Sequence, residues 1–156
     1  MRQILAWSLV SMTAALSTAR AETLAYGSRA GMEVTIVEKT NIDTTRAKIT
    51  VKHTRENAIA YCESYVGEVT EQCIKEELGK ALQSEIAANC TTGKFTTLYG
   101  EGYHFIGPNP DYDPTQYNTE FLVLSLPANE PLDGSEASGY GYNLDQFAAM
   151  CPSRVK

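Results

Sequence analysis

Positive charge is scarce in this sequence of 156 residues, which has 13 Lys and Arg against 19 Asp and Glu and a formal net charge of −6. No segment gathers Lys and Arg into a basic stripe. Because an acidic chain repels the phosphate backbones of DNA and RNA, we do not expect nucleic acid as a partner.

The residue patterns of several catalytic and metal-binding sites are also missing. The sequence has no Gly-x-Ser-x-Gly nucleophile elbow and no cysteine pair with the spacing of a zinc knuckle. Its only histidines are His53, which we expect to be solvated before a helix, and His104, which we expect on an outward strand face. We therefore predict no metal, no cofactor and no enzymatic activity. One alternative stays open, a small periplasmic hydrolase in which His104 acts with a carboxylate.

Long apolar runs are absent except near the start of the chain. The run Ile4 to Leu16 follows a basic Arg2 and precedes Ala-Arg-Ala at positions 19–21, a small-residue pattern that signal peptidase accepts. The run is shorter than the roughly 20 residues that span a bilayer. We predict a cleaved signal peptide over residues 1–21, a single mature domain over residues 22–156 and no membrane span after cleavage.

Cysteines are few but even in number. All four, Cys62, Cys73, Cys90 and Cys151, lie in the predicted mature domain, which is typical of two disulfides in an exported protein. Of the three possible pairings, we favour Cys62 with Cys73, which flank a short turn, and Cys90 with Cys151, which would tie a hairpin to the C-terminus. Disulfides predict an oxidising location, the periplasm or the outside of the cell.

Alternating apolar residues predict the strands. They occur over residues 32–37 and 47–51, which we expect to pair, and over residues 95–107, which we expect to form a hairpin. A two-residue turn at Gly100-Glu101 would close this hairpin directly, and a bulge at Gly102 is the alternative. The unbroken apolar run at residues 121–124 predicts a strand buried on both faces and central in the sheet. The polar segment 22–31 favours a loose lead-in.

Helix caps occupy other segments. Thr54 and Thr70 each precede apolar residues at helical spacing, and Gly67 ends the first helix, so a helical hairpin is expected. Asn143 is predicted to cap a C-terminal helix, with Gln146 in a capping box. Together these elements predict an α+β domain: a mostly antiparallel sheet of about five strands, a disulfide-stapled helical hairpin and a short C-terminal helix.

Tyrosines gather on a proline-rich loop and beside glycines near the C-terminal helix. The candidate binding residues there are Tyr112, Asp113, Tyr117, Tyr140 and Tyr142. Tyrosine offers a large rigid contact area together with a hydroxyl, which suits recognition of proteins or sugars. Two further tyrosines, Tyr99 and Tyr103, are expected to pack in the core on the inner face of the hairpin.

The function that these observations favour is a small exported, non-enzymatic binding protein. Its partner would be another protein or an envelope polysaccharide. One specific form is an inhibitor of an envelope-targeting enzyme, in which the acidic domain enters the cleft of a basic hydrolase. A structural component of the cell envelope is a further alternative.

Overall fold

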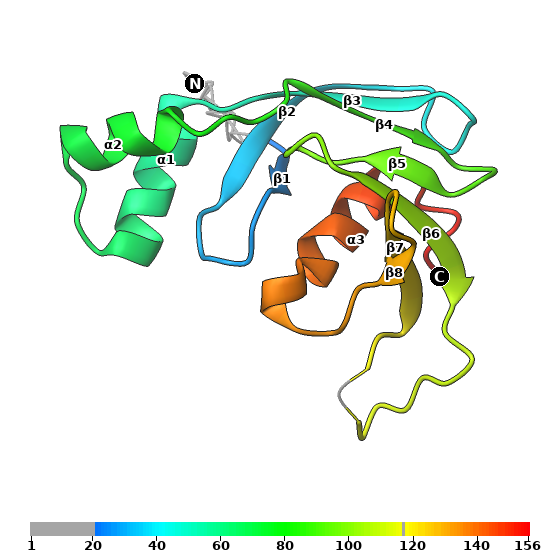
Figure 1. The fold of residues 1–156 in the computed structure, drawn as a ribbon. Coiled ribbons are helices and arrows are strands. Elements are labelled where there is room, and N and C mark those ends of the chain that lie inside the picture. The colour runs from blue at the N-terminus through cyan, green and yellow to red at the C-terminus, as the bar shows by residue number, and fades with distance from the viewer. Residues whose placement is uncertain (1–20, 117) are drawn as a thin grey trace, which may run out of the picture.

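The computed structural model describes residues 21–116 and 118–156 (Figure 1). Almost all of the predicted signal peptide therefore lies outside the described residues, and its cleavage stays a prediction. Tyr117, one of the candidate binding residues, also lies outside them. Within the described ranges, no helix has the length and apolar character needed to cross a bilayer.

Eight strands form one antiparallel sheet in which every strand pairs with its neighbour in the sequence. Their bounds are β1 Thr23–Ala25, β2 Glu33–Thr40, β3 Ala47–Lys52, β4 Glu85–Asn89, β5 Lys94–Thr96, β6 Gly102–Pro108, β7 Phe121–Ser125 and β8 Glu130–Pro131. The sheet curves around the C-terminal helix α3, Tyr140–Met150, as Figure 1 shows. The predicted α+β class with an antiparallel sheet is confirmed, but the expected number of strands, about five, was too low.

The three strands that were not predicted, β1, β4 and β8, have weak sequence patterns. β1 and β8 contain three and two residues, too few to show alternation, and the middle of β4 is rich in small alanines. Segment 22–31, expected to be a loose lead-in, pairs with β2 through residues 23–25 and buries Leu24 and Tyr26. A short segment becomes a strand here because its neighbour offers unpaired N–H and C=O groups.

A helical hairpin is inserted between β3 and β4, as predicted. Its elements are α1 Arg55–Tyr61, the π-helical turn η1 Cys62–Val66 and α2 Glu71–Leu78. The side chains of Thr54 and Thr70 cap α1 and α2 by accepting a backbone N–H from the first helical turn. Gly67 ends η1 in the left-handed conformation, at φ +81°, which glycine adopts without steric cost. The Cys62–Cys73 disulfide joins the two halves.

Helix α3 packs its apolar side against the inner face of the sheet. The Phe147 ring stacks on Phe105 of β6 with centroids 4.5 Å apart and lies 5.1 Å from the ring of Phe95 on β5. Aromatic pairs of this kind contribute roughly 0.5–1.5 kcal/mol beyond their buried area. The predicted cap of this helix was wrong, because the N-cap is Gly139 and Asn143 lies buried inside the first turn.

Gln146 was expected in a capping box and instead joins three elements. It is fully buried, its Oε1 accepts from the Leu98 N–H at 2.9 Å, and its Nε2 donates to the Ala25 carbonyl at 2.9 Å. One side chain therefore ties α3 to β1 and to the turn between β5 and β6. The capping-box prediction fails because the helix begins at Tyr140, which places Gln146 in its middle on the side that faces the sheet.

The hairpin of β5 and β6 is confirmed, but its turn is longer than the predicted two-residue loop. The reversal occupies residues 97–101 and is closed by the Thr97 N–H, which donates to the Glu101 carbonyl at 3.0 Å. Leu98 is fully buried, so the chain needs extra residues to bring this side chain into the core. Tyr99 next to it is turned outward and is 40% exposed, so its expected core position was wrong.

The strands on either side of the long loop follow the period-two rule for side-chain faces. Tyr103 of β6 is buried, as predicted, and His104 after it lies on the other face. β7 was expected to be central and buried on both faces, which was wrong: it is the seventh strand and buries alternate residues, Phe121 and Val123. A continuous apolar run therefore need not mark a central strand.

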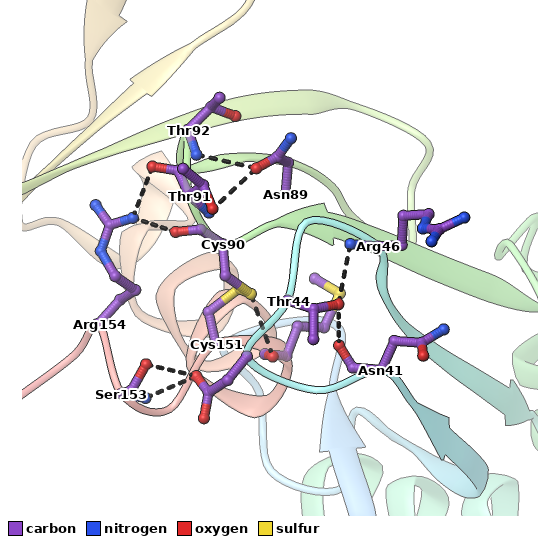
Figure 2. Close-up of a disulfide and its surroundings, with 12 residues drawn as sticks. Asn41, Thr44, Arg46, Asn89, Cys90, Thr91, Thr92, Cys151, Ser153 and Arg154 are labelled. Carbon is purple, nitrogen blue, oxygen red and sulfur yellow. Dashed lines mark hydrogen bonds between the residues drawn. A yellow bond between two sulfur atoms is a disulfide. The ribbon is translucent and has the colours of Figure 1, made fainter.

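The second disulfide fastens the C-terminal tail, as Figure 2 shows. Cys90, directly after β4, is bonded to Cys151 at the end of α3. Beside it, Asp43 accepts from the N–H and the hydroxyl of Ser153 at 2.9 and 2.7 Å, and Arg154 donates to the Cys90 carbonyl. Both favoured pairings are therefore present. Two disulfides indicate an oxidising, non-cytoplasmic environment.

Candidate functional site

Negative charge is concentrated in one part of the chain. Residues 95–153 contain eight acidic residues and no Lys or Arg, whereas the rest of the predicted mature domain contains eleven residues of each sign. The whole excess negative charge of that domain therefore belongs to one segment. This segregation is present in the sequence, but a net charge taken over the whole chain conceals it.

Part of this acidic segment lines a cavity of about 330 Å³. The walls come from the turn between β1 and β2, from the short 3-10 helix η2, Glu136–Ser138, and from the start of α3. The polar and aromatic residues of the lining are Ser28, Ser135, Glu136, Tyr140, Tyr142 and Asp145. Two of the predicted binding residues, Tyr140 and Tyr142, therefore share one site.

Local sequence explains how these two tyrosines are held. Gly139 has φ +74°, and a Cβ at this position would clash with the Tyr142 hydroxyl, so the close approach requires glycine. The Tyr140 hydroxyl accepts from the Phe121 N–H at 3.1 Å, which fixes this ring against the start of β7. Burial raises the pKa of both phenols, so they stay neutral hydrogen-bond donors.

The acidic turn that enters η2 is held by its own hydrogen bonds. Asp133 accepts from the side-chain hydroxyl of Ser135 and, at 2.8 Å, from its backbone N–H. These bonds lower the pKa of Asp133, which keeps it charged into acidic solution. Glu136 and Asp145 nearby are exposed at the rim of the cavity, where their charges can meet a partner.

The proline-rich loop between β6 and β7 carries the other predicted residues and does not line this cavity. Tyr112 is 42% exposed. Asp113 accepts from the N–H and hydroxyl of Thr115 at 2.8 and 2.7 Å and from Gln116 Nε2 at 3.0 Å. The bonds from Thr115, and then that from Gln116, lower the pKa of Asp113. Asp113 therefore organises the loop, and Tyr112 is the part of it that presents an aromatic surface.

His104, the residue of the alternative hydrolase hypothesis, lies on β6. Its Nε2 is 2.9 Å from the carbonyl oxygen of Thr92, a polar contact that does not involve an acid. Among the described residues, no carboxylate lies within 4.0 Å of the His104 ring nitrogens. The pairing that this hypothesis requires is therefore not formed at His104.

A buried polar cluster involving the helical hairpin was not foreseen from the sequence. Glu77 of α2 is only 2% exposed, with its Oε2 3.4 Å from Lys80 Nζ and its Oε1 3.7 Å from His53 Nε2. His53 was expected to be solvated, but only 12% of its side chain is exposed. Its ring packs edge-on against Tyr26 with centroids 5.6 Å apart. Glutamates crowd this helix in the sequence, and nothing local distinguishes the buried one.

The electrostatics of this cluster are set by burial. Burial lowers the pKa of His53 and the charge of Lys80 lowers it further, whereas burial raises the pKa of Glu77 and Lys80 opposes that shift. In the described part of the chain, neither ring nitrogen of His53 has a hydrogen-bond partner. Among the described residues, no serine, threonine or cysteine side chain is hydrogen-bonded to His53, as a nucleophile activated by this ring would be.

Comparison with protein-family models, with curated proteins and with solved structures finds no match to this chain. Of the arrangements described, the acidic cavity joins exposed charge, oriented tyrosines and a rigid scaffold in one place. That combination is typical of a recognition surface.

Proposed function

We propose that this chain is a small exported, non-enzymatic protein, periplasmic or secreted, that binds a cationic protein partner. The binding surface is the acidic end, which we define as the cavity lined by Ser28, Glu136, Tyr140, Tyr142 and Asp145. The observation that supports the proposal most directly is the segregation of the entire excess negative charge into residues 95–153. Such a field attracts a basic surface and raises the rate of association.

The tyrosines add what charge alone does not provide. Tyr140 is held by a hydrogen bond to the backbone of β7, and Tyr142 is held against Gly139. Rings that are already fixed lose little conformational entropy when a partner binds. Charge would therefore govern how fast the partner arrives, and the tyrosines would govern how long it stays.

In its most specific form, the proposed protein inhibits an envelope-targeting enzyme with a basic active-site cleft. An acidic end of this kind repels anionic wall polymers, which favours a protein partner over an envelope polysaccharide. The two disulfides suit a domain that works outside the cytoplasm without refolding.

The test uses the oxidised domain, residues 22–156, and a set of purified peptidoglycan hydrolases with basic or acidic isoelectric points. Binding is measured by calorimetry at low and high salt, together with inhibition of wall hydrolysis. We expect a basic hydrolase to bind at low salt and to lose at least about tenfold in affinity at high salt, because exposed charges are screened beyond roughly 10 Å at 0.1 M salt.

Matched variants locate the surface. Glu136→Gln with Asp145→Asn removes two charges from the rim of the cavity, and Glu63→Gln with Glu68→Gln removes two exposed charges from the helical hairpin. We expect the first pair to weaken binding about tenfold and the second by less than about twofold. Equal losses for both pairs would mean that only overall charge is sensed, and an affinity independent of salt would contradict the proposal.

A further inference from the structure

The face of the sheet that points away from α3 carries a shallow groove of about 530 Å³. It crosses strands β3 to β6 and ends at Leu126, just after β7. Figure 1 shows α3 against one side of these strands, and the exposed lining residues Lys48, Ala87 and Thr96 alternate with the buried ones along the strands. The groove and the acidic end share none of their lining residues, so an inference from one does not depend on the other.

The register of the sheet explains the floor of the groove. Lys48 of β3 lies opposite Ala87 of β4, and Thr96 of β5 lies opposite Gly102 of β6. The Ala87 N–H donates to Thr96 Oγ1 at 3.2 Å, and the Leu126 N–H donates to the Gly102 carbonyl at 2.9 Å. These contacts join the residues into one row across the sheet. The floor is low and mainly apolar because its middle consists of small side chains.

Three cationic side chains lie around the groove. Arg46, Lys48 and Lys94 all line it and are all exposed. Lys48 lies 3.0 Å from Glu85, whereas neither Arg46 nor Lys94 forms a salt bridge with another described residue. A domain with an excess of eight acids thus places uncompensated positive charge beside an apolar floor.

We propose that this groove binds an anionic amphiphile, a molecule with an extended apolar chain and one carboxylate. The carboxylate would lie between Arg46, Lys48 and Lys94, and the chain would follow the floor toward Leu126. Charge complementarity selects an anion, and the apolar floor selects one with a hydrocarbon body rather than a fully polar one. The four strands β3 to β6 and Leu126 beyond them are spaced by roughly 4.8 Å, which gives such a chain a path of about 19 Å.

Gly102 offers a substitution that fills the groove without disturbing the fold. A Cβ there would meet only Leu126, with its Cβ at 3.6 Å and its Cδ1 at 3.8 Å, which are ordinary contacts. Gly102 is also outside the left-handed region, so a β-branched residue is compatible with its strand conformation. Gly102→Val therefore raises the floor, and its Cβ fits without a shift of the backbone.

The experiment measures binding of dodecanoate below its micelle concentration to the oxidised domain, by calorimetry and by backbone amide chemical shifts. We expect binding, with shifts centred on β4 to β6, and none for dodecyltrimethylammonium, which has the same chain and the opposite charge. Gly102→Val should weaken binding about tenfold, because its side chain occupies space on the floor that the hydrocarbon chain would otherwise fill and bury. Lys94→Gln should weaken it about fivefold, and the control Lys75→Gln on α2 by less than about twofold.

Three results would overturn the proposal. The first is the absence of dodecanoate binding to a domain that has the wild-type melting temperature. The second is binding that Gly102→Val leaves unchanged, because the ligand would then lie elsewhere. The third is a domain that does not bind dodecanoate but self-associates at low salt, with the self-association abolished by both Gly102→Val and Lys94→Gln. The groove would then be an interface between copies of the chain.

Discussion

Replacing Gln146 with leucine removes the side chain that joins α3 to two other parts of the domain. Leucine is similar in size, but it can neither accept from the Leu98 N–H nor donate to the Ala25 carbonyl. Leu98 is fully buried, so its N–H has no access to water, and an unpaired buried donor costs about 1–3 kcal/mol. Ala25 is half-buried, so its carbonyl can be partly hydrated and adds less.

We therefore expect Gln146→Leu to lower the free energy of unfolding by about 2–3 kcal/mol. Gln146→Glu should cost more at neutral pH, because a buried carboxylate would face the Ala25 carbonyl oxygen. Protonation restores a donor at that position, so the pKa of the introduced group is raised in the folded state. The destabilisation caused by Gln146→Glu should therefore shrink as the pH falls toward about 4.3, the ordinary pKa of glutamate, and grow as the pH rises.

The assay is urea unfolding followed by circular dichroism and tyrosine fluorescence, since residues 22–156 contain no tryptophan. The matched control is Gln72→Leu, at an exposed position on α2 where the side chain bonds to Glu76. We expect this control to stay within about 0.5 kcal/mol of the wild type. If Gln146→Leu also stayed within that range, the two buried hydrogen bonds would not be what holds α3 in place.

Two further predictions concern the disulfides and the buried histidine. Replacing Cys90 and Cys151 with alanine should destabilise the domain by about 4 kcal/mol, and replacing Cys62 and Cys73 with alanine by about 3 kcal/mol. The difference is expected because the Cys90–Cys151 disulfide closes a longer loop than the Cys62–Cys73 disulfide. Urea titrations that show the reverse order would contradict this explanation. Burial lowers the pKa of His53 in the folded state below the unfolded value of 6.5. The neutral ring therefore contributes its full stability above pH 6.5, and this contribution is lost as the pH falls through the folded pKa. The stability of the wild type relative to His53→Gln should therefore decrease from pH 7.5 to about 5, and a difference independent of pH would refute the burial of this ring.

Several local features of the domain follow from residues only a few positions apart in the chain. Thr54 and Thr70 are N-caps because each side chain bonds to a backbone N–H three residues later. Gly67 ends the first helical stretch because it can adopt a positive φ. Residues 47–51 alternate cleanly and became β3, Ala47–Lys52. The segregation of acidic residues into 95–153 is equally a property of the sequence alone.

Part of the candidate site was also within reach of the sequence. Tyr140 and Tyr142 were selected because tyrosines beside glycines suit recognition, and the structure places both in one cavity. Tyr112 and Asp113 were selected because they lie on the proline-rich loop, but that loop does not line the cavity, and Asp113 bonds within the loop. Residue type indicated the chemistry, but it did not indicate which loops meet.

Which distant residues share an environment depends on contacts that form only in the folded domain. Gln146 lies 121 positions from Ala25. Glu77 differs from its neighbouring glutamates in its burial and in its contacts with His53 and Lys80. β1 and β8 are strands because a paired neighbour satisfies their backbone groups, not because of their own pattern. The physical reason is the same in each case. The periodicity of apolar residues in the sequence indicates which face of a helix or strand is apolar. The burial of a residue, the pairing of a strand and the pKa of a side chain depend on which other parts of the folded chain pack against that face.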